Sequence, residues 1–230
     1  HVTVVAPDGP RSGMSNAISV QQPMYLRPLN DPNWGTEEWQ KNATVYTTNG
    51  TPSDCVKLAL DVLFEGDPSR IQLLASGINH GSNAATASCY SGTLGAAMEG
   101  ALNGIPAIGV SLDTLHPDAD FSGVAQFFGD IFEKLMADWP EKHGIYYNVN
   151  FPDIPADKIK GIRAGYQGLG RWVREFKEWD VKHYEKYGLT PEMLGQSSTP
   201  VLEEGEDLYM MVGDFEDDPR NTADADHRIM

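Results

Sequence analysis

Apolar residues along the chain follow two different periods in turn, and this predicts a succession of strands and helices. Short β-branched or apolar runs predict strands at residues 1–6, 45–48, 71–75, 105–112, 144–151 and 159–164. Helical spacing of apolar residues predicts helices that begin at Thr51 or Ser53, at Thr93 and near Ser122. Strands that alternate with helices are typical of an α/β fold with a mostly parallel sheet and helices on both of its faces.

One stretch near the middle of the chain is suited to binding a ligand. The loops that follow parallel strands gather at one edge of the sheet, where ligands bind. Asn79 and Asn83 follow a predicted strand in such a loop, and Ser91 and Thr93 stand at the start of the next helix. Unpaired N–H groups and hydroxyls at a helix start favour an anion, while amide oxygens suit divalent cations. The stretch therefore predicts a metal and a phosphate at one site.

Charge and composition limit the partners of the chain. Its formal net charge of −16 argues against binding to nucleic-acid polymers, which requires a basic surface. A bound divalent cation would reconcile this acidity with a phosphate ligand. We expect no membrane span, because no run approaches the roughly 20 apolar residues that one requires. Two cysteines, Cys55 and Cys89, are too few for a disulfide framework, so we expect reduced thiols and a cytoplasmic location.

Four motifs, in matching order over residues 1 to about 165, resemble the SurE family of survival-protein-E nucleotidases. They lie in residues 4–16, 50–56 (Gly-Thr-Pro-Ser-Asp-Cys-Val), 76–100 and 148–152 (Asn-Val-Asn-Phe-Pro). The resemblance implies a metal-dependent 5′/3′-nucleotidase that hydrolyses nucleoside monophosphates with Mg²⁺ or Mn²⁺. It also implies a three-layer Rossmann-like core over residues 1–165. A C-terminal extension over residues 166–230 would join subunits into a homodimer or homotetramer.

The resemblance also implies roles for single residues. Ser12 and Asn79 match ligands of the divalent metal. The residues that match the phosphate site or the substrate pocket are Asn16, Asn83, Ser91, Gly92 and Thr93. Two of these have structural alternatives, since Ser91 suits a plain helix N-cap and Asn16 suits an Asx turn. His80 could assist proton transfer to the leaving group, although a lone loop histidine is more often a bystander.

Two departures from the family pattern change what we expect of residues 1–230. The family has an Asn-Asp-Asp-Gly motif near its start and a strand ending near Thr-Pro-Leu, and both are absent here, so we expect a chain truncated at both ends. A neutral amide and a hydroxyl hold Mg²⁺ or Mn²⁺ poorly, which predicts half a metal site and no turnover. The nucleophile, water or an aspartate, is expected in the absent segment. The family also commonly has a glycine shortly after the second asparagine, where this sequence has Ala84 and Ala85.

Two other interpretations stay open at this point. A non-catalytic nucleotide- or phosphate-binding module would keep the pocket at the helix start. An acidic interaction protein would depend instead on residues 203–226, where a solvated arm explains the crowded carboxylates better than a metal site does. Residues 171–187 are rich in aromatic and charged side chains, which is typical of a contact surface or of a helix packed on its own core.

Overall fold

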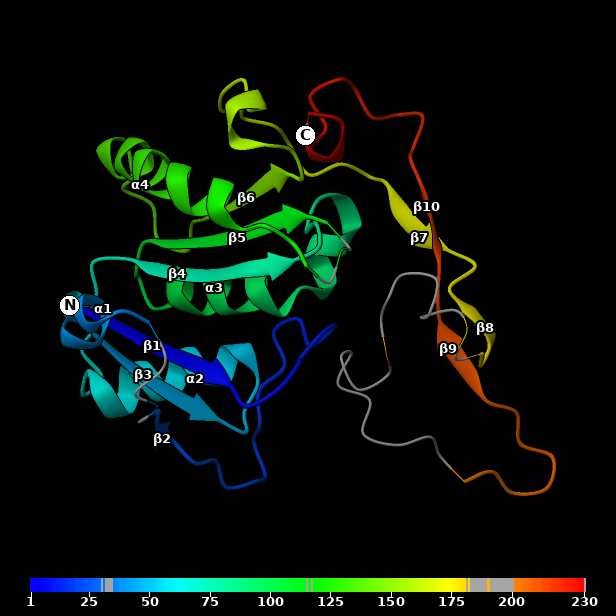
Figure 1. Ribbon diagram of the computed structural model, residues 1–230, viewed down its shortest axis with the longest axis horizontal. Helices are drawn as coiled ribbons and strands as arrows, with labels where there is room; N and C mark the ends of the chain where they lie inside the picture. Colours follow the sequence, from blue (N-terminus) through cyan, green and yellow to red (C-terminus); the bar gives the residue numbers. More distant parts are fainter. Residues whose placement is uncertain are drawn as a thin grey trace. The chain divides into compact units, whose positions relative to one another are not determined.

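The protein is described from a computed structural model, which covers residues 1–29, 31, 35–114, 116, 118–180, 182, 190 and 201–229. Its longer helices and strands follow in the order β1 (Val2–Pro7), β2 (Arg27–Pro28), α1 (Glu37–Asn42), β3 (Ala43–Thr48), α2 (Pro52–Leu58), β4 (Leu74–His80), α3 (Gly92–Leu102), β5 (Ala107–Asp113), α4 (Ser122–Ala137), β6 (Tyr146–Pro152), β7 (Arg171–Val173), β8 (Phe176–Glu178), β9 (Tyr209–Met211) and β10 (Asp214–Glu216) (Figure 1). Short helical turns occur at Ala59–Leu63, Pro68–Arg70, Ala85–Tyr90, Ala156–Lys158 and Asp226–Arg228.

The strands form two three-stranded sheets and two short ladders. The sheets have the orders β1-β3-β2 and β4-β5-β6, and the ladders pair β10 with β7 and β8 with β9. β1 runs parallel to β3, whereas β2 runs antiparallel to it. The arrows of β4, β5 and β6 all point the same way (Figure 1). This is the α/β arrangement with mostly parallel strands that the sequence predicts.

The chain divides into two compact units, and each is described by itself. Unit 1 comprises residues 1–76, 90–109 and 141–147, and unit 2 comprises residues 77–89, 110–140 and 148–230. This grouping differs from the predicted domains, 1–165 and 166–230, which stay predictions.

Capping residues mark the ends of the two longer helices of unit 1. Thr51 caps α2 in a capping box with Asp54, so of the two predicted caps the first is correct. Ser91 caps α3, and Gly104, with φ +76°, follows the C-cap of that helix. The core of unit 1 includes three alanines and the side chains packed against them: Ala97, Ala101, Ala107, Leu74 and Tyr146.

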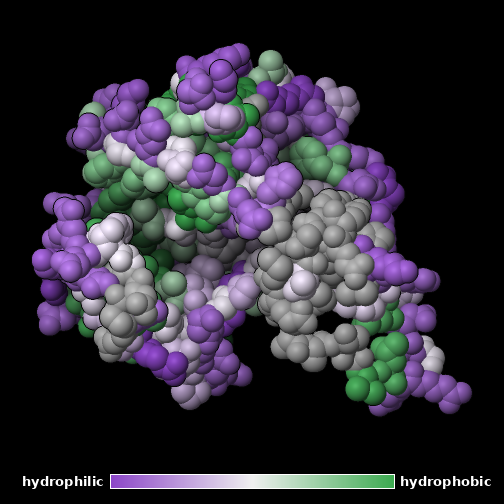
Figure 2. All heavy atoms as spheres, in the orientation of Figure 1, coloured by the Kyte–Doolittle hydropathy of each residue, from purple (hydrophilic) through white to green (hydrophobic). Residues whose placement is uncertain are grey.

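Unit 2 contains α4 and the two ladders. α4 buries Val124 and Ile131, as its apolar period predicts. In the ladder of β8 and β9, Phe176 lies opposite Met211, and their exposed fractions are 68% and 62%. Toward the lower right of Figure 2, where Figure 1 draws β8, β9 and the chain leading into β9, hydrophobic atoms lie at the surface. No helix among the residues that the structure describes is long and apolar enough to cross a membrane.

Three sequence-based expectations about the elements need correction. β4 begins at Leu74 and continues through His80, so Asn79 lies in a strand instead of a loop. Residues 159–164 form no strand and are mostly exposed, because their alternating pattern finds no partner strand. Arg171–Val173 and Phe176–Glu178 form strands, which excludes a helix there. Tyr184 and Tyr187, from the same predicted contact surface, lie outside the described residues.

Candidate functional site

The predicted site residues fall in both compact units, so each half of the site is built separately. Unit 1 holds Ser12, Asn16, Ser91, Gly92 and Thr93. Unit 2 holds Asn79, His80 and Asn83.

In unit 1, the loop of residues 11–19 lies against the first turns of α3. The backbone N–H of Ser15 donates to the Tyr90 carbonyl at 3.0 Å. A methyl group added at Gly95 would place its Cβ 2.0 Å from the Ser15 carbonyl oxygen and 2.9 Å from Oδ1 of Asn16. One added at Gly92 would lie 3.5 Å from the carbonyl oxygen of Arg11. The structure therefore brings the Ser12–Asn16 loop and the Ser91–Thr93 helix start together, as predicted for unit 1.

Arg11 anchors the start of this loop. Its guanidinium donates to the carbonyl oxygens of Gly50 at 3.2 Å and Asn49 at 3.3 Å, and to the Asp8 carboxylate at 2.6 Å. The Tyr25 hydroxyl also donates to Asp8 at 2.6 Å. This hydroxyl, and then Arg11, hold the pKa of Asp8 below its usual value. Ser12 therefore follows a residue that these three contacts fix, although Ser12 itself is exposed.

Thr51 and Asp54 brace the other end of the loop. The Thr51 hydroxyl donates to the Ala17 carbonyl at 2.6 Å, and the Ser19 N–H donates to Asp54 at 3.0 Å. Burial raises the pKa of the Asp54 carboxyl, but backbone N–H groups of Thr51 and Ser19 outweigh burial and hold the pKa low. The Gly-Thr-Pro-Ser-Asp motif thus caps α2 and positions the site loop. The sequence motif alone did not reveal the hydrogen bond from Ser19 to Asp54, because it joins residues far apart in the chain.

The start of α3 has the chemistry of an anion site. The Ser91 Oγ accepts from the Leu94 N–H at 3.2 Å, so Ser91 is a helix N-cap, as the structural alternative predicted. Its hydroxyl proton can still be donated to a ligand. Ser91 and Gly92 are buried and Thr93 is half-buried. The N-terminal end of the helix dipole adds positive potential there. Capping and anion binding are therefore compatible at this position.

In unit 2, Asn79 is oriented by its own strand end. Its Nδ2 donates to the Gly81 carbonyl at 2.7 Å, which makes Oδ1 the atom of this amide with the chemistry of a metal ligand. Gly77 and Gly81 have φ +128° and +117°, which glycine adopts without strain. His80 is exposed, and its ring meets Phe121 edge-on at 6.0 Å. Proton transfer by His80 stays a prediction.

Asn83 is buried, with an exposed fraction of 5%, and is held from three sides. Its Nδ2 donates to the Ser111 hydroxyl at 2.8 Å, and its N–H donates to Oδ1 of Asn150 at 2.9 Å. Nδ2 of Asn148 donates to the Asn83 carbonyl at 2.9 Å. The Asn-Val-Asn motif therefore holds the loop of Asn83. Its two-residue spacing, which places both amides on one face of β6, was the signal available in the sequence.

The donor atoms fit a hard cation in type but not in charge. The Ser12 hydroxyl and the Asn79 amide oxygen are neutral oxygen ligands. Over the described ranges, no cluster of three or more His, Cys, Asp or Glu side chains could hold a metal ion. Ser12 and Asn79 also belong to different units, so their meeting on one ion stays a prediction.

Comparison with known proteins identifies the family. The family model described as survival protein SurE matches residues 1–174. The chain belongs to the SurE family. This confirms the resemblance that the four motifs predict.

Similar SurE proteins cover most of this chain. A protein named 5′-nucleotidase SurE from Cytophaga hutchinsonii is 40% identical over 187 residues, which are 81% of this chain and 66% of that protein. The protein of the same name from Phocaeicola vulgatus is 35% identical over 98% of this chain and 74% of its own length. The SurE chain thus spans about two thirds of the length of the curated relatives it matches.

A solved structure shares the fold. The crystal structure of the SurE protein from Aquifex aeolicus matches with a TM-score of 0.66 and 27% identity, over 97% of this chain and 75% of that one. The likeness confirms the predicted Rossmann-like α/β fold class of this SurE chain.

Proposed function

We propose that the SurE protein to which these residues belong hydrolyses nucleoside monophosphates, at the 5′ or 3′ position, to nucleoside and phosphate with the help of a divalent metal. The observation that carries the proposal is the Ser12–Asn16 loop fixed against the capped start of α3. Membership of a family whose members are named 5′-nucleotidase supports the same reaction.

Each half of the site has a role in this proposal. Backbone N–H groups and hydroxyls of Ser91, Gly92 and Thr93 bind the phosphoryl oxygens. Asn16 and Asn83 line the substrate pocket. The Ser12 hydroxyl and Oδ1 of Asn79 are ligands of Mg²⁺ or Mn²⁺. When bound, such an ion supplies charge that polarises the phosphoryl group and activates a nucleophile.

The same donor set predicts weak metal binding by residues 1–230 alone. Two neutral oxygens, without a carboxylate cluster in the described part of the chain, hold a hard cation poorly. We therefore expect little turnover from the 230-residue polypeptide. A version extended at its start by an Asp-Asp segment of a relative should release phosphate in the presence of Mg²⁺ or Mn²⁺. If the extended protein shows no metal-dependent hydrolysis, the nucleotidase proposal is wrong.

Substitution of Asn79 tests the metal ligand directly. In the extended protein, Asn79→Ala should lower the rate of phosphate release from nucleoside 5′- and 3′-monophosphates about 10- to 100-fold. It should lower the affinity for Mn²⁺, measured by calorimetry, by a similar factor. Asn42→Ala is the matched control, because Asn42 is exposed on α1 and its side chain donates to its own helix, at the Glu38 carbonyl. Equal losses in both variants would contradict a metal role for Asn79.

One observation favours a second function, a non-catalytic phosphate- or nucleotide-binding module. It is the lack of a cluster of metal-binding side chains among the described residues. Binding of inorganic phosphate by the extended protein, without any hydrolysis and without help from Mg²⁺, would favour the module. Hydrolysis that EDTA abolishes would favour the enzyme.

The exposed apolar side chains of the β8–β9 ladder support assembly of subunits. Phe176, Met211 and Tyr209 are exposed by 68%, 62% and 55%. We propose that residues 166–230 join copies of the chain into a homodimer or homotetramer. Phe176→Ser with Met211→Ser should shift the mass measured by light scattering toward a monomer. A cytoplasmic location is part of the proposal and is consistent with two cysteines that form no disulfide.

A further inference from the structure

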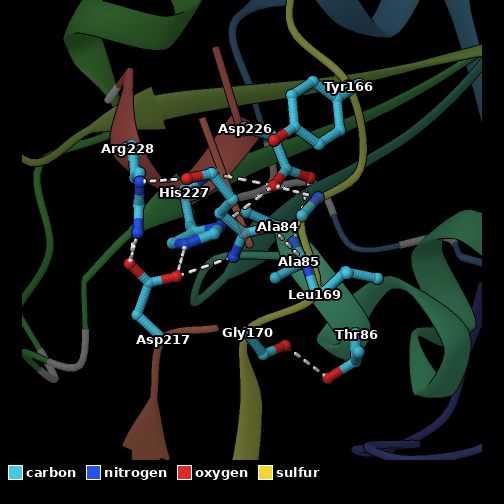
Figure 3. Close-up of polar contacts among 12 residues, drawn as sticks. Ala84, Ala85, Thr86, Tyr166, Leu169, Gly170, Asp217, Asp226, His227 and Arg228 are labelled. Atoms are coloured by element: carbon cyan, nitrogen blue, oxygen red, sulfur yellow. Dashed lines mark hydrogen bonds and ion pairs between the residues drawn. The ribbon is translucent and has the colours of Figure 1, made fainter. Parts of the chain in front are cut away.

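We propose that Asp226 is a positioning residue that holds the loop after Asn83 in a left-handed backbone conformation, and thereby shapes the substrate pocket from the C-terminal segment. The inference rests on the proposed function, because that function assigns Asn83 to the pocket. Figure 3 shows the contacts that carry it.

Ala85 is the residue that needs support. It has φ +50° and an exposed fraction of 0%. Side chains other than glycine rarely adopt this conformation, because Cβ approaches the backbone too closely. The chain therefore holds an alanine there against its preference.

The Asp226 carboxylate bonds the strained turn to a second segment. Its Oδ2 accepts from the Ala85 N–H at 2.9 Å, and its Oδ1 accepts from the Gly168 N–H at 3.0 Å (Figure 3). The N–H and the hydroxyl of Thr86 both donate to the Gly170 carbonyl, at 3.1 and 2.7 Å. One carboxylate thus bridges the loop that follows Asn83 and the segment that precedes β7.

The surroundings of Asp226 hold it in place. The next residue, His227, has a side chain exposed by 10%, and its Nε2 lies 2.7 Å from the Asp217 carboxylate. Asp217 is also bonded to Arg228, whose Nε donates at 2.7 Å. A methyl group at Gly168 would place its Cβ 2.4 Å from the His227 ring, so the two segments are closely packed. Asp226 is half-buried, so the expectation of a solvated acidic arm is wrong for this residue, whereas Asp217 is exposed although it is paired.

Asn83 is consequently fixed from both sides. Its side chain is bonded to the buried Ser111, and the backbone two residues later is bonded to Asp226. Without Asp226, the buried Ala85 N–H would lose its acceptor, and with it one of the hydrogen bonds that oppose rotation of Ala85 toward negative φ. That rotation would displace the loop of Asn83, and a small displacement in a substrate pocket weakens binding and turnover.

The test compares three variants of the extended protein described above. In Asp226→Ala, we expect KM for a nucleoside monophosphate and Kd for inorganic phosphate to rise about tenfold. Asp207→Ala is the matched control, since Asp207 is exposed on the same C-terminal segment, and should leave both constants unchanged. The double variant Ala85→Gly/Asp226→Ala should regain most of the loss, because glycine adopts positive φ without support. A loss that Ala85→Gly does not rescue, or no loss at all, overturns the proposal.

Hydrogen exchange separates this inference from the proposed function. The Ala85 amide should exchange at least tenfold faster in Asp226→Ala than in the parent, and at the parental rate in Asp207→Ala. This readout requires neither turnover nor phosphate binding, so it decides the role of Asp226 even if the nucleotidase proposal fails. Should Asp226→Ala lose its native circular dichroism, Asp226→Leu gives the same comparison, since leucine fills a similar space and offers no acceptor to the Ala85 N–H. Unchanged exchange at Ala85 in the folded variant overturns the proposal.

Discussion

Gly95→Ala is the sharpest test of how the site loop is positioned. Gly95 lies one turn into α3, where alanine is normally the better helix former by about 1 kcal/mol. In this protein the backbone of Ser15 crosses the helix at that position. The added Cβ would lie 2.0 Å from the Ser15 carbonyl oxygen, 2.7 Å from its carbonyl carbon and 2.9 Å from Oδ1 of Asn16.

The size of the effect follows from these distances. Ordinary contact begins at 3.4 Å, so the Ser15 carbonyl would have to retreat by about 1.4 Å from its 2.0 Å position. Two atoms in the way are backbone, which cannot rotate aside, and the loop is bonded to Tyr90, Thr51 and Asp54. Overpacking of this kind costs about 1–3 kcal/mol. The gain in helix propensity offsets about 1 kcal/mol of this cost, so we expect a net loss of up to about 2 kcal/mol in the free energy of unfolding.

Gly129→Ala is the matched control. Gly129 is an exposed residue within α4, and an added Cβ there would have no neighbour within 4 Å. We expect this variant to gain about 0.5–1 kcal/mol in urea unfolding, and its melting temperature to rise by about 2–4 °C per kcal/mol. Gly95→Ala should also weaken phosphate binding, which Gly129→Ala should not. If both variants gain stability equally, the close approach of the Ser15 loop to α3 is refuted.

Three further predictions concern single side chains. Burial raises the pKa of the Cys55 thiol to about 12. Iodoacetamide at neutral pH should therefore modify the exposed Cys89 in the native protein and reach Cys55 only after denaturation. Equal labelling of both cysteines in the native protein, measured by mass spectrometry, would contradict this. Ser53 has a buried hydroxyl without a hydrogen-bond partner, so Ser53→Ala should leave the urea midpoint unchanged or raise it, and a clear fall would show that the hydroxyl has a role. Hydrogen bonds from Arg220 lower the pKa of Asp218 from 3.8 to about 2. A carboxyl group whose pKa is lower in the folded than in the unfolded protein stabilises the fold above the unfolded pKa, so this stabilisation should be lost as the pH falls from 3.8 to about 2. Asp218→Asn should remove that part of the acid sensitivity of unfolding.

Local rules predicted the parts of the fold that depend on neighbours in sequence. Thr51 and Ser91 are caps because a hydroxyl there reaches the N–H three residues later. The continuation of β4 to His80 was missed, since it depends on main-chain contacts with β5, such as the Gly81 N–H with the Leu112 carbonyl. Residues 159–164 carry a strand pattern but no partner, and a strand is stable only when its backbone groups are paired.

The site shows the same division between local and distant information. The motifs identified Ser12 and Asn16 as candidates, and residue type alone justified them. What holds their loop is Thr51 and Asp54, more than 30 residues away in sequence, and the open surface of α3 at Gly95. Contacts of this kind depend on tertiary packing, which a single sequence does not reveal.

Ala85 has a backbone conformation that its residue type does not predict, because a distant contact stabilises it. Judged by its neighbours alone, an alanine argues against a left-handed turn after Asn83. The turn is present with φ +50°, because a carboxylate 141 residues later accepts its N–H. That carboxylate is in turn fixed by a histidine, an arginine and a second aspartate in the segment that the sequence suggested was solvated. The acidic C-terminal residues and the alanine after the second asparagine, two features that looked unrelated in the sequence, are therefore parts of one arrangement.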